Sequence, residues 1–178
     1  MIRTFYAAHS HIRVAILAAM LAGVVAACAR HEEPIARPAT ALRPAVVRPS
    51  RWPIESLPVI TSEFGESRAG GRVHKGLDLA APTGTPVHAT ADGEVVFAGW
   101  KSGYGHTVIL RHSPTIETLY AHLDRILVAV GAPVRQRVRI GLVGASGNAT
   151  GPHLHYEVRM RGVAVEPRHY LPVYTAEK

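Results

Sequence analysis

Histidine is the residue type whose number and spacing in this chain most clearly suggest chemistry. The sequence contains 11 histidines, most of them in its second part, after residue 52: His74, His88, His106, His112, His122, His153, His155 and His169. Histidine is the commonest metal ligand and the usual acid or base near neutral pH. This density therefore favours a metal site or an acid–base site in the second part of the chain.

Two short patterns have the spacing of metal ligands. In the segment HKGLD (74–78), His74 and Asp78 are four residues apart, and Gly76 allows a tight path between them. In HLH (153–155), both imidazoles project from one face of an extended strand, with their Cα atoms about 7 Å apart. Each pattern also occurs in structural or surface pairs, so spacing alone predicts no more than a metal-dependent hydrolase.

The chemistry that such a set would perform follows from the number of ligands. Two histidines and one aspartate would leave a catalytic zinc ion one open position for water. The ion would remain a good Lewis acid, which lowers the pKa of bound water toward about 7 and polarises a carbonyl. Further histidines beside the ion would act as a general base or stabilise an oxyanion.

Short β-type runs separated by turn residues make up most of the chain after Pro53. They cover residues 93–100, 106–112, 116–122, 140–143 and 153–160. Gly, Pro, Asp and Ser residues precede most of them, as is typical of turns. The pattern favours one short helix, near Asp124–Val128. Strands at this spacing predict a mostly β fold, a small antiparallel sheet or sandwich.

Two of the predicted strands divide their side chains between faces. The strand at 153–160 places on one face His153, His155, Glu157 and Arg159, and on the other Leu154, Tyr156, Val158 and Met160. The strand at 116–122 places on one face Ile116, Thr118, Tyr120 and His122. In the strand at 153–160, one face would thus pack and the other would present polar groups, and His122 would lie at the end of the strand at 116–122.

These motifs occur in an order that resembles the LytM/lysostaphin-type zinc metallopeptidases, which cleave peptidoglycan peptides. The resemblance covers roughly residues 58–172 and runs through GRVHKGLD (71–78), APTGTPV (81–87), ADGEV (91–95), GYG (103–105), YAHL (120–123), IG (140–141), TGPHLHYE (150–157) and EP (166–167). It implies a small antiparallel β fold with a groove that admits an extended peptide. It also implies one Zn²⁺ per domain, with His74, Asp78 and His155 as ligands. His122 and His153 match the family's two further histidines, which activate water and stabilise the developing oxyanion.

The chain departs from the family pattern at two places outside these five positions. Arg137-Val138 stands where the family has a Gly-Gln pair, and His106 stands where it often has Asn. Arg135, Arg137 and Arg139 alternate, which fits a solvated strand face or a basic edge that contacts anionic wall polymer. His106 is interpreted either as a substrate contact or as a surface histidine.

The first 27 residues have the pattern of a lipoprotein signal peptide. Arg3 and Arg13 flank the start, residues 14–27 form an apolar run too short to span a membrane comfortably, and the sole cysteine, Cys28, follows directly. This resembles a lipobox, which implies lipidation of Cys28 and a membrane anchor. The alternative is an ordinary signal or an uncleaved anchor. Ala29 is not acidic, which favours the periplasmic side of the outer membrane.

The domain organisation follows from these boundaries. We expect a signal peptide at 1–27, a lipidated, disordered Pro-rich tether at 28–52, a peptidase domain at 53–173 and a tail at 174–178. Of the formal charge of +7, residues 1–51 carry +5, with seven basic and two acidic residues. The basic excess thus lies mainly outside the folded part, and no basic stripe with interleaved aromatics predicts a nucleic-acid partner.

Three functions remain open on the sequence. The first is an active endopeptidase that cuts a D-alanyl–diaminopimelate cross-link or, less in keeping with a lipoprotein leader, a pentaglycine bridge. The second is a non-catalytic peptidoglycan-binding activator of a partner cell-wall hydrolase. The third is a structural lipoprotein that holds the wall. All five site positions are present, which favours the enzyme.

Overall fold

The computed structural model describes residues 47–55 and 59–173. Within them, nearly all regular structure is β, and the only helix is the 3₁₀ turn Pro167–His169. The strands are β1 (Val59–Ser62), β2 (Ser67–Arg68), β3 (Arg72–Val73), β4 (Leu77–Ala80), β5 (Pro86–His88), β6 (Gly93–Lys101), β7 (Gly105–Ser113), β8 (Ile116–Ile126), β9 (Pro133–Val134), β10 (Arg139–Val143), β11 (His153–Met160) and β12 (Val163–Val165). The predicted mostly β fold is confirmed.

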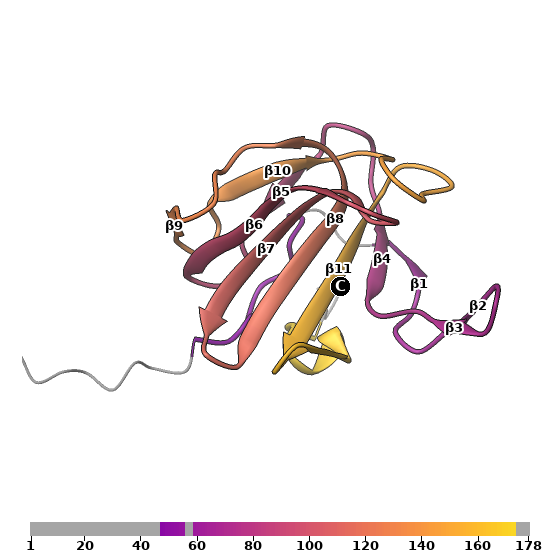
Figure 1. The fold of residues 1–178 in the computed structure, drawn as a ribbon, viewed down its shortest axis with the longest axis horizontal. Coiled ribbons are helices and arrows are strands. Elements are labelled where there is room, and N and C mark those ends of the chain that lie inside the picture. The colour runs from indigo at the N-terminus through magenta and orange to yellow at the C-terminus, as the bar shows by residue number, and fades with distance from the viewer. Residues whose placement is uncertain (1–46, 56–58, 174–178) are drawn as a thin grey trace, which may run out of the picture. The chain divides into compact units, whose positions relative to one another are not determined.

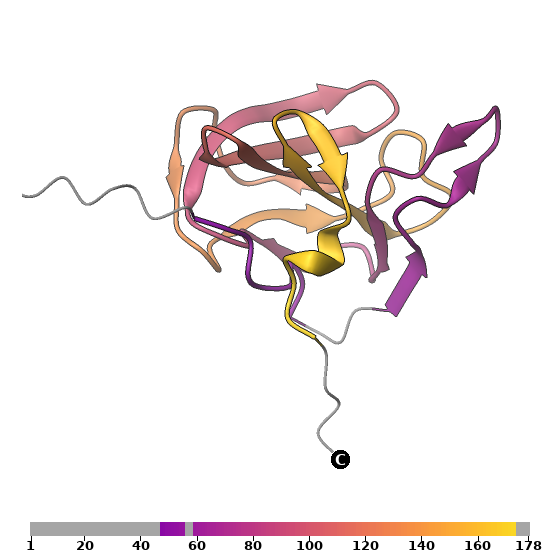
Figure 2. The same ribbon diagram turned by 90° about the horizontal axis from the view of Figure 1, so that it is seen from below.

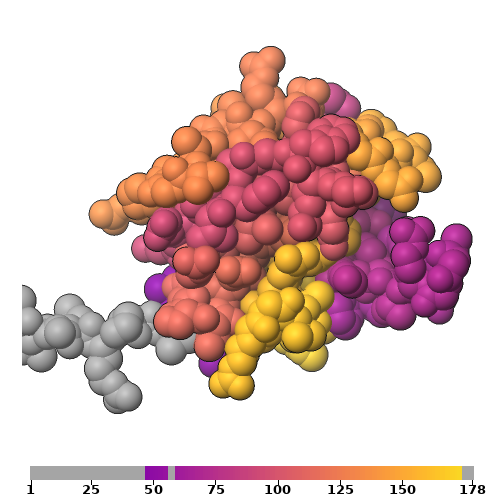
Figure 3. Space-filling model, viewed as in Figure 1, coloured from indigo at the N-terminus to yellow at the C-terminus, as the bar shows by residue number. Residues whose placement is uncertain are grey.

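One antiparallel sheet contains most of these strands (Figure 1). Its order is β1-β4-β11-β8-β7-β6-β9, while β10 pairs with both β5 and β8, and β12 pairs with β11. Strands β4 and β11 are therefore neighbours although they are far apart in the sequence. The β2–β3 hairpin forms a separate small sheet that projects from one side of the domain (Figures 1 and 3).

The hydrophobic core lies between the long strands and the β5–β10 pair, which Figure 2 shows as two layers. Val87 of β5 and Ile140 of β10 join one buried cluster with Leu110 of β7, Tyr120 of β8 and Leu154 of β11. Burial of apolar surface from both layers stabilises the sheet on which the site is built.

The helix predicted near Asp124–Val128 is wrong. Strand β8 continues through this segment to Ile126, and Leu142 of β10 pairs with Arg125. A helix of one turn is unfavourable because it restricts the backbone of several residues and forms few hydrogen bonds in return. Strand β10 offers the same backbone a full ladder, which a reading of local sequence does not include.

Part of the predicted tether contacts the domain. The Ser50 amide donates to the Thr90 carbonyl oxygen at 3.1 Å, and the Trp52 indole donates to the Pro172 carbonyl oxygen at 3.1 Å. Residues 1–46, including Cys28, and the tail 174–178 lie outside the described residues. Among the residues that are described, no apolar helix has the length that a bilayer crossing requires.

Candidate active site

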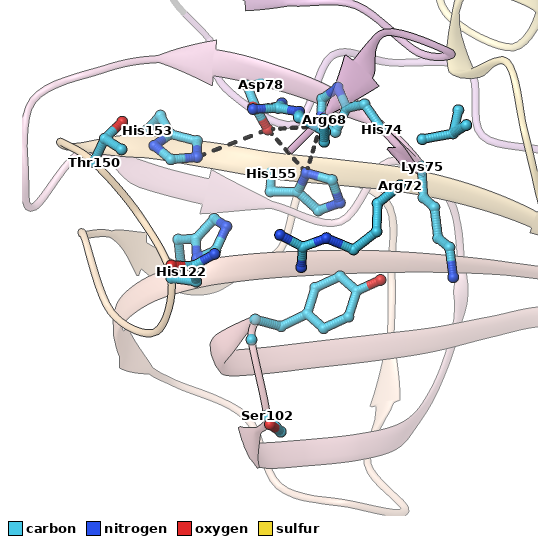
Figure 4. Close-up of a pocket in the computed structure, with 14 residues that line it drawn as sticks. Arg68, Arg72, His74, Lys75, Asp78, Ser102, His122, Thr150, His153 and His155 are labelled. Carbon is cyan, nitrogen blue, oxygen red and sulfur yellow. Dashed lines mark hydrogen bonds and ion pairs between the residues drawn. The ribbon is translucent and has the colours of Figure 1, made fainter. Parts of the chain in front are cut away.

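The three predicted metal ligands converge at the β4–β11 junction (Figure 4). Asp78 in β4 is the register partner of His155 in β11, and His74 precedes β4. The Asp78 Oδ1 atom lies 2.8 Å from His155 Nδ1 and 3.1 Å from His74 Nε2, and these two nitrogens are 3.0 Å apart. Antiparallel pairing of β4 with β11 therefore brings together ligands that are far apart in the sequence.

The hydrogen bonds behind these residues determine which atoms could hold a cation. His74 Nδ1 lies 2.7 Å from the Glu63 carbonyl oxygen and must donate to it, so Nε2 keeps its lone pair. His155 Nε2 lies 3.0 Å from Glu157 Oε1, which leaves Nδ1 with its lone pair. In their neutral forms, the two imidazoles and Asp78 Oδ1 turn three acceptor atoms toward one point.

This donor set fits a zinc ion. Three ligand atoms bound tetrahedrally at about 2.0 Å would lie about 3.3 Å from one another. The observed separations of 2.8 to 3.1 Å are close to that value. Acceptors at this spacing repel one another unless a proton or a cation lies between them. His74, Asp78 and His155 are accordingly the residues that could bind the metal.

Glu157 supports His155 from behind and is fully buried. Its Oε1 atom also accepts a hydrogen bond from the Tyr104 hydroxyl at 2.8 Å, and its Oε2 atom accepts one from Arg159 Nε at 2.7 Å. Burial raises the pKa of Glu157, but the contacts with His155 and Arg159 outweigh it and lower the pKa below its ordinary value. The carboxylate is therefore ionised and fixes the tautomer of His155, as carboxylates behind metal-bound histidines do.

Asp78 is oriented by an arginine from the projecting hairpin. Arg68 Nη2 lies 2.6 Å from Asp78 Oδ2 and 2.7 Å from Ser62 Oγ, which leaves Oδ1 facing the histidines. Burial raises the pKa of Asp78, but its hydrogen bonds with His155 and His74 dominate and hold the pKa far below its usual range. The pKa of His155 is raised, because Asp78 and Glu157 together outweigh the opposing effect of burial.

His122 reaches the site through a β-bulge, which corrects the predicted strand faces. The ring of Tyr120 contacts Tyr156 in the core, whereas the ring of His122 lies 4.7 Å from that of His153 on the opposite face. Between β7 and β8 the register shifts at this point, and His122 has a positive φ of 58°. A bulge adds one residue to a strand and re-aims the next side chain. Placing His122 and Tyr120 on one face was therefore wrong, although the rings of His122 and His153 do lie side by side, as their predicted roles require.

Both non-ligand histidines turn Nε2 toward the pocket. His122 Nδ1 donates to the Ser146 carbonyl oxygen at 2.8 Å, and His153 Nδ1 donates to the Gly151 carbonyl oxygen at 2.8 Å. His153 Nε2 lies 3.7 Å from Asp78 Oδ1. Burial is the main cause that lowers the pKa of His122 to about 4, so this imidazole is neutral at pH 7. A neutral ring with a free Nε2 can accept a proton.

The loop that carries Ser146 is hydrogen-bonded to the turn before β7. The Asn148 amide donates to the Gly103 carbonyl oxygen at 3.0 Å, and Ser146 Oγ donates to the Leu123 carbonyl oxygen at 2.6 Å. A Cβ atom at Gly147 would lie 2.3 Å from the Gly105 nitrogen, so both glycines permit this close approach. The contact holds the carbonyl group that fixes the tautomer of His122.

A pocket of about 480 Å³ contains the five histidine and aspartate positions. Tyr104 lines it as well, with its ring 5.6 Å from that of His155. The roles of Tyr104, Arg68 and Glu157 were missed by the sequence analysis. Tyr104 belonged to a recognised motif, and Glu157 to the polar face of its strand, but neither pattern indicates what the side chain contacts.

The remaining histidines of interest lie away from this pocket. His112 is buried, with Nδ1 donating to the Asp92 carbonyl oxygen and Nε2 2.7 Å from Thr118 Oγ1. His106 Nδ1 lies 3.2 Å from the Leu123 carbonyl oxygen, and its ring packs edge-on to Trp100. His112 is therefore held within the fold, and neither histidine lines the pocket. Arg135, Arg137 and Arg139 are all exposed.

An antiparallel β domain with a His–Asp–His cluster and two further histidines in one pocket defines a metallopeptidase-like site. Comparison with known proteins identifies the family: the sequence profile of Peptidase family M23 matches residues 72–167, more than half of the chain. The chain therefore belongs to the M23 peptidases, the zinc metallopeptidase family that includes the LytM and lysostaphin types.

Individual relatives agree with this assignment. The chain is 54% identical over 96 residues to the DD-carboxypeptidase/endopeptidase Mpg of Neisseria meningitidis, an alignment that covers 54% of this chain and 22% of Mpg. It is 39% identical over 120 residues to the murein hydrolase activator EnvC of Escherichia coli, covering 67% of this chain and 28% of EnvC. The chain thus spans about a quarter of the length of these curated relatives.

Solved structures support the fold. A zinc-containing peptidase from Vibrio cholerae superposes with a TM-score of 0.63 at 38% identity, covering 67% of this chain and 39% of that one. The catalytic domain of lysostaphin from Staphylococcus simulans superposes with a TM-score of 0.61 at 30% identity, covering 64% of this chain and 91% of the domain. The predicted lysostaphin-type fold is confirmed.

Proposed function

We propose that the protein is a zinc-dependent endopeptidase that hydrolyses peptide cross-links of bacterial peptidoglycan. The proposal rests on one observation. Three acceptor atoms, from His74, Asp78 and His155, converge in one pocket. Two further histidines, His122 and His153, line the same pocket. A zinc ion held by these atoms would supply Lewis acidity toward a carbonyl oxygen and toward water.

The chain's own residues provide the proton chemistry. His122 Nε2 faces the pocket with a free lone pair and accepts the proton of the attacking water, because its Nδ1 is committed to Ser146. His153 lies beside His122, with Nε2 3.7 Å from Asp78 Oδ1, and when protonated at Nε2 it donates a hydrogen bond to the oxygen on which negative charge develops. Tyr104 adds a hydroxyl group at the pocket wall.

The proposed bond is the D-alanyl–diaminopimelate cross-link. Mpg is named a DD-carboxypeptidase/endopeptidase, and ShyA of Vibrio cholerae, 44% identical over 117 residues, is named a peptidoglycan DD-endopeptidase. Both names support a DD bond over a pentaglycine bridge. Lipidation at Cys28 would hold the enzyme on the periplasmic side of the envelope, at the outer membrane, within reach of the wall.

A second candidate function is supported by one relative. EnvC is named an activator of murein hydrolases, and its likeness to this chain spans 120 residues. An activator needs the groove but not the metal or the proton-transferring histidines. This chain keeps the three ligands and both His122 and His153 in one pocket, which supports the enzyme.

The test is clearance of purified peptidoglycan by the full-length protein in detergent, together with its zinc content. We expect about one zinc per chain and loss of turbidity. His155→Ala should lose both, because it removes one of three ligands, whereas replacing the exposed His169 by Ala should change neither. Stoichiometric zinc in His155→Ala would refute the ligand assignment, and clearance without zinc would refute the proposed function.

A further inference from the structure

The lysine and arginine side chains of the active-site pocket all come from its hairpin side. Arg72 and Lys75 lie on the side of the projecting hairpin, whereas Thr150 lies beyond His153 at the opposite end (Figure 4). Among the described residues that line the pocket, Asp78 carries the one carboxylate. Asp78 is already paired with Arg68. The hairpin end of the pocket therefore carries its lysine and arginine charges, and the described residues at the other end include no lysine or arginine.

A second depression extends the pocket beyond its basic end. It has a volume of about 370 Å³ and shares Val73, His74 and Lys75 with the first pocket. Its other walls include Phe64 and Val163, and none of the described residues that line it is acidic. Val73 and Val163 are 57% and 67% exposed, so their apolar surface is available to a ligand in this depression. The depression thus combines apolar walls with positive charge.

Lys75 is the cation of these two depressions that borders both of them and has no partner among the described residues. Arg68 is held by Asp78 and Ser62, Arg159 is held by Glu157, and Arg72 Nε donates to the Ala69 carbonyl oxygen. Lys75 is exposed and, among the residues that the structure describes, has no hydrogen-bond or ion-pair partner. The Arg72 guanidinium lines the first depression only, whereas Lys75 borders both, so Lys75 is placed to reach a ligand in the second.

We propose that Lys75 is a specificity-determining residue that binds a carboxylate of the substrate on the hairpin side of the scissile bond. The substrate class is an anionic peptide in which a residue with a free carboxylate and a short aliphatic arm follows the groove into the second depression. The apolar walls there contact the arm, and Lys75 pairs with the carboxylate. The inference rests on the proposed function, where the free carboxylates of diaminopimelate have this chemistry.

The charge at position 75 should then determine how much more tightly the protein binds a substrate with a carboxylate than the same substrate with a carboxamide. A charge-assisted hydrogen bond at an exposed lysine lies at the lower end of its range, so we expect a preference of about fivefold to tenfold. The probes are two fluorescent stem-peptide dimers joined by a D-alanyl–diaminopimelate bond. They are identical except that the diaminopimelate carboxylates are free in one and converted to carboxamides in the other.

Binding is measured by fluorescence anisotropy on the zinc-loaded full-length protein in detergent. A His122→Ala background keeps the three metal ligands and slows hydrolysis of the probes. Lys75→Gln should bind both dimers equally, Lys75→Arg should retain the preference, and Lys75→Glu should favour the carboxamide. Arg135→Gln removes an exposed cation that lines neither depression and should behave like the parent.

The outcomes separate this inference from the proposed function. An unchanged preference in Lys75→Gln, no preference in the parent, or no measurable binding of either dimer would each overturn the role of Lys75. Hydrolysis is followed in parallel with His122 intact. Hydrolysis of both dimers at equal rates would overturn the role of Lys75 but would still support the proposed endopeptidase function. A preference for the carboxylate dimer that depends on Lys75, with no hydrolysis of either dimer, would support the role of Lys75 and favour the activator over the endopeptidase.

Discussion

Replacing the buried carboxylate behind His155 should weaken zinc binding without removing a ligand. In the Glu157→Gln variant the side chain keeps its shape, and its amide oxygen can still accept hydrogen bonds from Tyr104 and His155. The amide nitrogen then faces Arg159 Nε, which now donates to Glu157 Oε2 at 2.7 Å. Two donors would oppose each other in a site where residue 157 is fully buried.

The expected size follows from the two roles of this carboxylate. Loss of a carboxylate that orients a metal-binding histidine costs about 10-fold to 100-fold in metal affinity. Breaking a buried ion pair by neutralising one partner costs about 3–5 kcal/mol of stability. Arg159 keeps 18% of its side chain exposed and can reach water, so we expect the lower part of the stability range, about 3 kcal/mol.

The assay is competition for zinc between the full-length protein and a chromophoric chelator, with thermal unfolding recorded on the same samples. Glu117→Gln is the matched control, because Glu117 lies on the adjacent strand, pairs with Arg111 at 3.5 Å and is 29% exposed. It should change zinc affinity by less than about twofold and stability by less than about 1 kcal/mol. A folded Glu157→Gln protein with the zinc affinity of the parent would refute the account of how His155 is held.

Three further predictions concern the fold and the anchor. Gly76→Ala places a Cβ 2.3 Å from the Tyr156 carbonyl oxygen and should lower the free energy of unfolding by about 2 kcal/mol or more, measured by calorimetry. In the control Gly151→Ala, the added Cβ has no described atom within 4 Å, so stability should change little. Equal effects of the two substitutions would contradict the packing argument. Burial is the main cause that lowers the pKa of His112 below 6.5, so the unfolded chain binds more protons and stability is lost as pH falls below about 6.5, by at most about 1.4 kcal/mol per pH unit. Thermal unfolding of His112→Gln should show a smaller loss between about pH 7 and pH 5, and an identical loss would rule out this contribution. Cys28→Ser should abolish incorporation of labelled fatty acid, and continued labelling would refute the lipoprotein prediction.

The strands were predictable because their alternation reflects a local property. Residues 153–160 were predicted as a strand with two distinct faces, and β11 has the same bounds, with Leu154, Tyr156 and Val158 in the core. The polar face, however, is not a solvent surface: His155 and Glu157 are buried as well. Burial of that face depends on β4 and on Tyr104, which reach it from elsewhere in the chain.

Non-local pairing explains what the sequence analysis missed. The end of β8 forms because β10 pairs with it, so a local reading of Asp124–Val128 favoured a helix instead. His122 faces the site because a bulge opposite β7 interrupts strict alternation, and no residue type marks that bulge in advance. The identity of the five site residues came from the order of motifs, whereas their tautomers and supports required the fold.

The most direct test of the central claim is the muropeptide composition of intact cross-linked peptidoglycan after incubation with the zinc-loaded full-length protein. Mass spectrometry of the products identifies the bond that is cut, and a His122→Ala variant with zinc verified as bound serves as the control. The account predicts that dimers joined by D-alanyl–diaminopimelate bonds decrease and monomers increase, and that His122→Ala produces no such change. Unchanged dimers with zinc bound to the protein, or equal loss of dimers with His122→Ala, would contradict it.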